Sequence, residues 1–101
     1  MTTFKINFDK ETSTLKIGFN PEKPATNVEL VKDAEAEINA VKDKIMGPLL
    51  KITGPASLPV AFVLAHTLSH LCGAIAIFDP KLGKFVVAVS HNPDFKLGDS
   101  I

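Results

Sequence analysis

The sequence predicts a small α/β protein with a minimal Rossmann-like mixed sheet, in the order β-β-α-β-α-β-β. In residues 4–8 and 15–19 apolar residues alternate with polar ones, as half-buried strands require, whereas two central segments repeat apolar residues every three or four positions, as helices require. The length of 101 residues suits a single domain, residues 1–101. Apolar residues make up 46% of the chain, which favours a packed core over disorder.

The first half of the chain contains a predicted hairpin and a predicted helix. The hairpin pairs residues 4–8 with residues 15–19 around the polar stretch "DKETS". The helix begins at Thr26, because Thr26 and Glu29 match a capping box, and it ends at Gly47-Pro48. Its apolar residues recur at steps of three and four and define the face expected to pack on the sheet: Val28, Val31, Ala34, Ile38, Val41 and Ile45.

The second half predicts a strand, a helix, two further strands and a tail. The strand 49–53, the helix 58–71 and the strand 73–79 form a parallel βαβ unit, and 73–79 lacks strict alternation, which favours burial on both faces. Residues 84–90 return antiparallel, and the tail 91–101 adds a short edge strand. Ser57 is the expected N-cap of the helix.

Two histidines lie on the face of the helix 58–71 that points away from the sheet. The other face, expected to pack on the sheet, carries Val60, Ala61, Leu64, Ala65, Leu68 and Leu71. His66 and His70 share their face with Phe62 and Val63, so this face also needs a cover. A second copy of the molecule is the expected cover, which predicts a homodimer with His66 at or near its interface.

Two loops follow the carboxyl ends of the parallel strands, where open α/β sheets bind ligands. The first opens a helix, so its N–H groups suit a phosphate; it consists of Gly54, Pro55, Ala56 and Ser57. The second supplies Asp79 and Lys81. All 11 basic residues are lysines, so a phosphate would be held by backbone N–H groups, lysine charges or a metal ion.

His70 and His91 are expected at the opposite end of the sheet from these two loops. The strand 73–79 separates the two ends by roughly 20 Å at about 3.3 Å per residue. His70 and Asp79 would therefore act on one substrate only if they came from different protomers, as in a head-to-tail stack. For the same reason His66 and His70 are not predicted to form a metal site with Asp79.

Several segments resemble a family of small proteins from type III CRISPR systems. The segments are "GPASLPVAFVLAH", "LSH", "AIFDPKLGKFVVAVSH" and the closing "GDSI", and the resemblance is strong over residues 49–101. Members of that family are ring nucleases that degrade the messenger cyclic tetra-adenylate, and they have also been described as manganese-dependent RNA deadenylases. Their fold is a minimal Rossmann-like one, and their dimers are thought to sandwich the ring.

The resemblance implies a role for four residues of this sequence. His70 would be the catalytic histidine and Asp79 its acidic partner. Lys81 stands where the family usually has arginine. Lysine carries the same positive charge but lacks the planar guanidinium group that can bind a phosphate through two hydrogen bonds. His91 would be the second family histidine, near a Mn²⁺ ion that Asp79 also contacts.

The function expected from the sequence is therefore cleavage of cyclic tetra-adenylate by a metal-dependent phosphodiesterase. The alternatives are a non-catalytic module that sequesters the messenger or a short oligoadenylate RNA, and a 3′ RNA deadenylase. A formal net charge of zero argues against a DNA-binding protein. Neither a signal peptide nor a membrane span is predicted, so a cytoplasmic location is expected, and the lone Cys72 is expected to be a small buried thiol.

Overall fold

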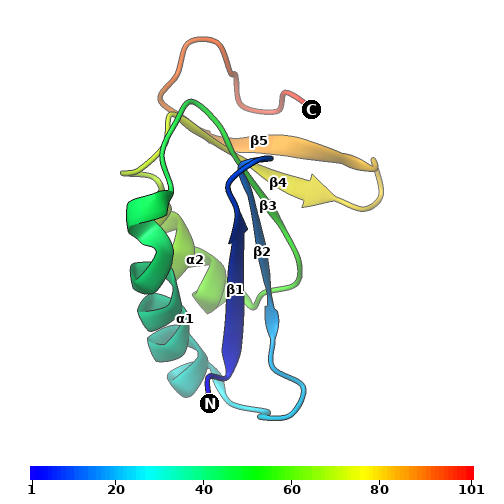
Figure 1. Cartoon of the computed structure of the whole chain (residues 1–101). Helices are drawn as coiled ribbons and strands as arrows, with labels where there is room; N and C mark the ends of the chain where they lie inside the picture. Colours follow the sequence, from blue (N-terminus) through cyan, green and yellow to red (C-terminus); the bar gives the residue numbers. More distant parts are fainter.

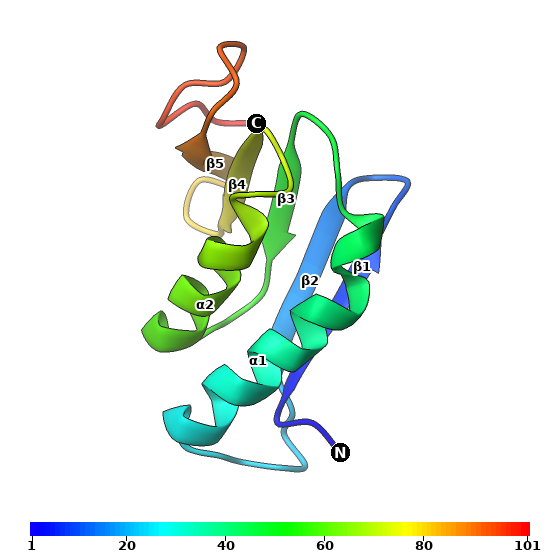
Figure 2. The ribbon, with the colours of Figure 1, turned by 90° about the vertical axis from the view of Figure 1, so that its left-hand side faces the viewer.

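Five strands form one mixed sheet, and both helices lie on the same face of it (Figures 1 and 2). The computed structural model describes all 101 residues. The elements are β1 (Phe4–Asp9), β2 (Thr14–Phe19), α1 (Asn27–Val41), a 3₁₀ turn η1 (Lys42–Lys44), β3 (Leu50–Thr53), α2 (Leu58–Leu68), β4 (Ala74–Asp79) and β5 (Lys84–Ser90). The predicted fold class and element order are thus confirmed.

The strands lie in the sheet in their order along the chain, from β1 to β5. The pairs β1–β2 and β4–β5 are antiparallel hairpins, whereas β2–β3 and β3–β4 are parallel, and α1 and α2 connect the two parallel pairs. The predicted parallel unit around α2 is confirmed. Because β2, β3 and β4 run in the same direction, their carboxyl ends meet at one edge of the sheet.

The hydrophobic core fills the space between the two helices and the sheet. Helix α1 buries Leu30, Ala34 and Ile38 there. The predicted face of this helix was right at Ala34 and Ile38 and wrong at Val28, of which 66% is exposed. Leu30 is buried instead because it lies four residues before Ala34, in the same row along the helix, whereas Val28 lies six residues before it.

Both helices are shorter than the sequence patterns predicted. Helix α1 has 15 residues and ends at Val41, where η1 takes over, and α2 ends at Leu68 with Ser69 as C-cap. Thr26 is the N-cap of α1, but its side chain makes no capping hydrogen bond, so the predicted capping box is wrong. Backbone bonds from Glu29 and Leu30 to the Thr26 carbonyl close the first turn instead. Neither helix combines the length and the apolar content that a membrane crossing needs.

Strand β4 is buried on both faces only in its first half. Ala74, Ile75 and Ala76 are buried, but 40% of Ile77 and 36% of Phe78 is exposed, so the predicted full burial is wrong for the second half. Phe78 is exposed because both helices lie on the opposite face, and on its own face only the tail covers the sheet, near Ala74 and Ala76, through Phe95. Ile77 is on the helix face and is exposed because it lines an open groove beside α2. The predicted edge strand of the tail is present as an antiparallel bridge from Val86 to Ser100.

An apolar groove of about 530 Å³ remains open beside α2. Ala61 and Ala65 line it and are exposed, so the prediction that they pack on the sheet is wrong. Their small side chains leave a gap between the helix and the strands, which Ile77 and Ala88 line from the other side. Phe62 also lines the groove and is 69% exposed, as predicted, whereas Val63, predicted on the same uncovered surface, is half-buried against the core.

Candidate functional site

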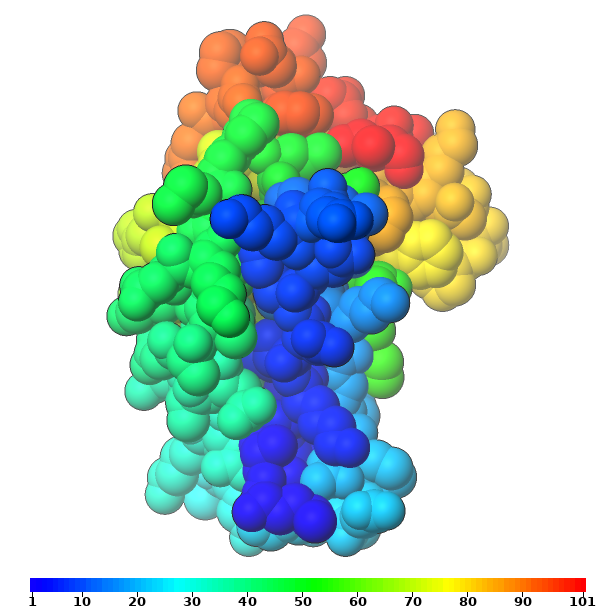
Figure 3. Space-filling model, viewed as in Figure 1, coloured from blue at the N-terminus to red at the C-terminus, as the bar shows by residue number.

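The carboxyl pole, as we call residues Gly54–Ser57 and Asp79–Lys84, lies where β3 and β4 end. The parallel register sets Ile52 beside Ile77, so the two chain segments leave the sheet from neighbouring positions. The turn between β4 and β5 projects from the body of the molecule, as the yellow and orange lobe in Figure 3 shows. The sequence prediction that both ligand loops share one edge of the sheet is confirmed for the backbone.

The loop Gly54–Ser57 is held tightly against β2 and against α1. Gly54 has a φ of 121°, and a Cβ atom on it would lie 1.8 Å from the carbonyl oxygen of Ile17. Only glycine tolerates this backbone position. The hydroxyl of Ser57 accepts a hydrogen bond from the N–H of Val60 at 3.4 Å, which confirms it as the N-cap of α2, and donates one to Asn27 Oδ1 at 2.7 Å.

The contact between Ser57 and Asn27 was not predicted from the sequence. It joins the N-terminus of α2 to the N-terminus of α1, across 30 residues of chain. Both helix N-termini thus lie at the carboxyl pole and direct the positive ends of their dipoles there. No local pattern in the sequence indicates this contact, because it depends on the packing of α1 beside α2.

Asp79 closes the β4–β5 hairpin. Its Oδ1 atom accepts hydrogen bonds from the N–H groups of Lys81 at 2.9 Å and Leu82 at 3.3 Å, and its carbonyl accepts one from Gly83. The second carboxylate oxygen, Oδ2, makes no hydrogen bond within the chain. The Lys81 side chain is exposed at the tip of the turn. Asp79 therefore has a structural role, yet keeps one oxygen for a ligand.

The amino pole, as we call His66, His70, Gly73 and His91, lies at the other end of β4. The N–H of His91 donates to the carbonyl of Gly73 at 2.7 Å, which brings β5's end beside β4's start. All three imidazoles belong to exposed residues, and none makes a side-chain hydrogen bond within the chain. The rings of His66 and His70 are in edge-to-face contact, with their centroids 5.7 Å apart.

Cys72 lies beside the amino pole, but its thiol is directed inward. Its Sγ atom donates to the carbonyl of Leu68 at 3.3 Å. Partial burial raises the pKa of this thiol above its usual value, so the thiol stays protonated at neutral pH. A protonated thiol is a poor metal ligand. Cys72 packs against the core, but it is half-buried and not the buried thiol that the sequence predicted.

The structure does not bring the predicted site residues of one chain together. Strand β4 has six residues, and at about 3.3 Å per residue it places His70 and Asp79 more than roughly 15 Å apart. His91 lies with His70, so His91 and Asp79 cannot share one manganese ion within a chain. No group of three or more His, Cys, Asp or Glu side chains is arranged to hold a metal. The residues of one protomer thus do not form the manganese site that the resemblance implies.

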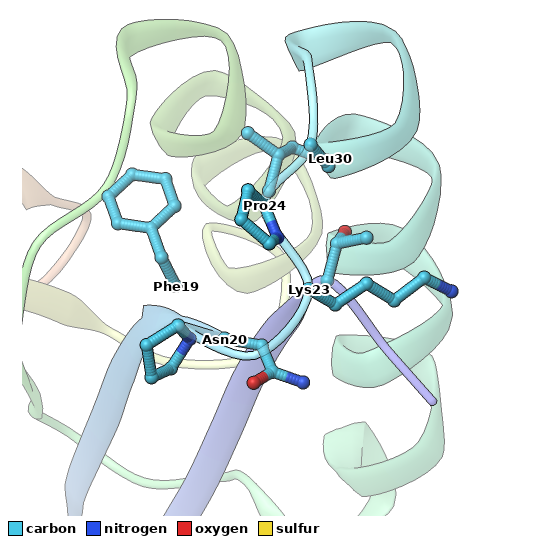
Figure 4. A pocket seen from close by; sticks show the side chains of 8 residues that line it. Phe19, Asn20, Lys23, Pro24 and Leu30 are labelled. Atoms are coloured by element: carbon cyan, nitrogen blue, oxygen red, sulfur yellow. The ribbon is translucent and has the colours of Figure 1, made fainter.

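A second hollow, of about 280 Å³, lies at the carboxyl end of β2 (Figure 4). Phe19, Pro24 and Leu30 line its apolar side. Asn20, also in its wall, is buried, with its amide donating to Thr2 at 2.8 Å and accepting from Glu22 at 3.0 Å. These polar atoms are satisfied within the chain, so Asn20 offers no free group that would recognise a ligand.

Comparisons with known proteins place the chain in a family. A family model described as "CRISPR-associated protein (Cas_csx3)" matches residues 44–101, more than half of the chain. The chain belongs to this family. The match to Cas_csx3 includes β3, α2, β4 and β5, and hence both poles.

The chain is also similar to a curated protein. An uncharacterized protein of Aquifex aeolicus (strain VF5) is 36% identical over 76 residues, which cover 72% of this chain and 68% of that protein. No solved structure matches the chain. The family assignment therefore rests on the match to the family model over residues 44–101.

Proposed function

We propose that the protein is a ring nuclease, a phosphodiesterase that cleaves cyclic tetra-adenylate and so switches off type III CRISPR defence. The observation that carries the proposal is the division of the candidate residues between the two ends of β4, with His70 at one and Asp79 and Lys81 at the other. Such a division suits a ligand held between two chains. Membership of a CRISPR-associated family supports this choice of substrate.

Each candidate residue has a chemical role in this reaction. A ribose 2′-hydroxyl or a water molecule attacks the phosphorus, and the P–O bond to the departing ribose oxygen breaks. His70 takes the proton from the attacking oxygen or gives one to the departing oxygen, because an exposed imidazole without a partner in the chain is available to the substrate. Lys81 stabilises the charge that develops on the phosphate oxygens. Asp79 orients the nucleophile through Oδ2, while Oδ1 maintains the turn. The N–H groups of Gly54–Ser57 bind a neighbouring phosphate. Manganese bound by Asp79 of one chain and His91 of another stays a prediction, and none of these steps depends on it.

The proposed assembly has two different contacts between chains, a dimer contact at the groove beside α2 and a stacking contact that joins the two poles. Phe62, Ala61 and Ala65 present an uncovered apolar face, which a second copy covers in a homodimer. Dimers then stack head to tail, so that the carboxyl pole of one faces the amino pole of the next. This contact is heterologous, because it joins two different surfaces.

A mixing experiment tests the two-chain site. His70→Ala and Asp79→Asn proteins are each assayed for cleavage of cyclic tetra-adenylate by chromatography, and each is expected to lose at least about a hundredfold in rate. Asparagine keeps the Oδ1 acceptor, so the turn is preserved. In an equal mixture, about a quarter of the junctions join an intact His70 to an intact Asp79, and activity returns to roughly that fraction of the wild-type rate.

The controls separate chemistry from folding. His66→Ala is a matched variant on the same helix and is expected to keep full activity, and circular dichroism should show all four proteins folded. Full activity of the His70→Ala protein would refute the assignment of the catalytic histidine. A mixture that co-assembles and stays inactive would refute the shared site.

A non-catalytic messenger sink is the second candidate. The observation that favours it is that Ser57 and Asp79, two of the predicted site residues, already have structural hydrogen bonds. A sink binds one equivalent of ligand and forms no product, whereas an enzyme turns over an excess. Equal concentrations of linear oligo-A and of the ring, tested side by side, distinguish a 3′ RNA deadenylase from a ring nuclease.

A further inference from the structure

We propose that His66 and His70 form a two-histidine site for a borderline transition-metal ion such as Zn²⁺ or Ni²⁺, and that the ion blocks His70. From the sequence alone, His66 and His70 were not predicted to form a metal site, because Asp79 lies too far away to be a third ligand. The structure brings the two rings themselves into contact, with their centroids 5.7 Å apart. The inhibitory part of the inference rests on the proposed function, whereas the binding part does not.

The distance between the rings suits a shared ion. A metal–imidazole nitrogen bond is about 2.0–2.1 Å, so a shared ion lies roughly 3 Å from each ring centre and bridges centroids up to about 6 Å apart. Both residues are exposed and neither imidazole has a hydrogen bond to give up, so side-chain rotation is enough to point one nitrogen of each ring at the ion.

The local electrostatics also favour a cation. His66 lies in the last turn of α2, at the negative end of the helix dipole. Between Lys51 and Lys81 the chain carries no lysine or arginine, so no basic residue on α2 or β4 repels an incoming ion. An all-nitrogen pair prefers Ni²⁺, Cu²⁺ or Zn²⁺ to Mn²⁺, which takes oxygen ligands more readily and forms weaker complexes.

The site is expected to be reversible. No third His, Cys, Asp or Glu side chain completes the group, so water fills the remaining positions on the ion. Such an ion exchanges with solvent, in contrast to a structural zinc with four protein ligands. Because one of the two ligands is His70, a bound ion withholds that imidazole from proton transfer.

Titration calorimetry of the untagged full chain with ZnCl₂, NiCl₂ and MnCl₂ tests the binding. We expect one Zn²⁺ or Ni²⁺ per chain, far weaker binding of Mn²⁺ at this site, and a loss in Zn²⁺ affinity on the order of tenfold or more in His66→Ala and in His70→Ala, since each variant removes half of the chelate. His91→Ala is the matched control, because it removes an exposed histidine of the same pole and should leave the Zn²⁺ binding that depends on His66 unchanged, whatever its effect on a manganese site shared between chains.

The result that would overturn the inference is equal Zn²⁺ affinity of the His66→Ala and wild-type proteins, or a loss that follows His91 instead of His66. A second readout tests the block: Zn²⁺ should slow cleavage of cyclic tetra-adenylate by the wild type and have at least about tenfold less effect on His66→Ala. If the protein is not a ring nuclease, the calorimetry still decides whether the site exists.

Discussion

The two poles of β4 differ in how their side chains are used. At the carboxyl pole, Ser57 caps α2 and contacts α1, Asp79 closes a hairpin, and Gly54 lies against β2. At the amino pole only the backbone is bonded, and the histidine side chains are exposed without hydrogen bonds in the chain. Substitution of His70 therefore tests function alone, whereas substitution at the carboxyl pole changes stability as well.

The largest expected effect is on Gly54, which we compare with Gly73 at the other pole. Gly54→Ala should lower the free energy of unfolding by roughly 3 kcal/mol or more, because its Cβ atom meets the Ile17 carbonyl at a positive φ. Gly73→Ala should cost only about 1 kcal/mol, because its Cβ atom comes no closer than 3.0 Å to Pro48 and Asn92 can shift. Urea denaturation measures both, and equal losses would contradict the difference between the poles.

A smaller effect on stability is expected when a serine is replaced at each end of α2. Ser57→Ala should cost about 1 kcal/mol, since it removes the N-cap of α2 and the bond to Asn27. Ser69→Ala, the matched change at the C-terminus of the same helix, should stay within about 0.5 kcal/mol, because that hydroxyl is on the surface. Equal destabilisation of the two variants in thermal unfolding would contradict the expected difference between Ser57 and Ser69.

The smallest effect concerns pH and lies near the carboxyl end of β2. The hydroxyl and N–H of Thr3 donate to Asp33 Oδ2 at 2.7 and 2.8 Å, and these bonds hold the pKa of Asp33 below its usual 3.8. Because the folded-state pKa is depressed, this contribution to stability is present above pH 3.8 and is lost as the pH falls through the lowered value.

Urea midpoints measured across acid pH test this contribution. Asp33→Asn should remove part of the loss of stability that the wild type shows below pH 3.8. Asp43→Asn, at an exposed position in η1, serves as the control and should follow the wild-type curve. An Asp33→Asn curve that is parallel to that of the wild type at every pH would contradict the assignment.

Much of the fold could be predicted, because its strongest patterns are local. The alternation around Leu15 and Ile17, the cap at Ser57 and the spacing of Ala34 and Ile38 each depend on neighbouring residues, and each prediction was confirmed. The errors occurred where burial depends on distant elements. Ala61 on α2 and Ile77 on β4 look like core residues in sequence, yet both are exposed because nothing in the chain covers that side of the groove.

The sequence by itself determined the element order, the parallel unit around α2 and the separation of His70 from Asp79. Strand direction follows from the βαβ connection and the separation follows from the rise per residue of an extended strand, so these conclusions needed no tertiary contacts. Only the tertiary structure showed that both helices pack on the same face of the sheet and that Ser57 donates a hydrogen bond to Asn27. It also showed that one carboxylate oxygen of Asp79 accepts hydrogen bonds within the β4–β5 turn. These features depend on where elements far apart in sequence pack, or on the conformation that one turn adopts, and residue patterns do not encode either directly.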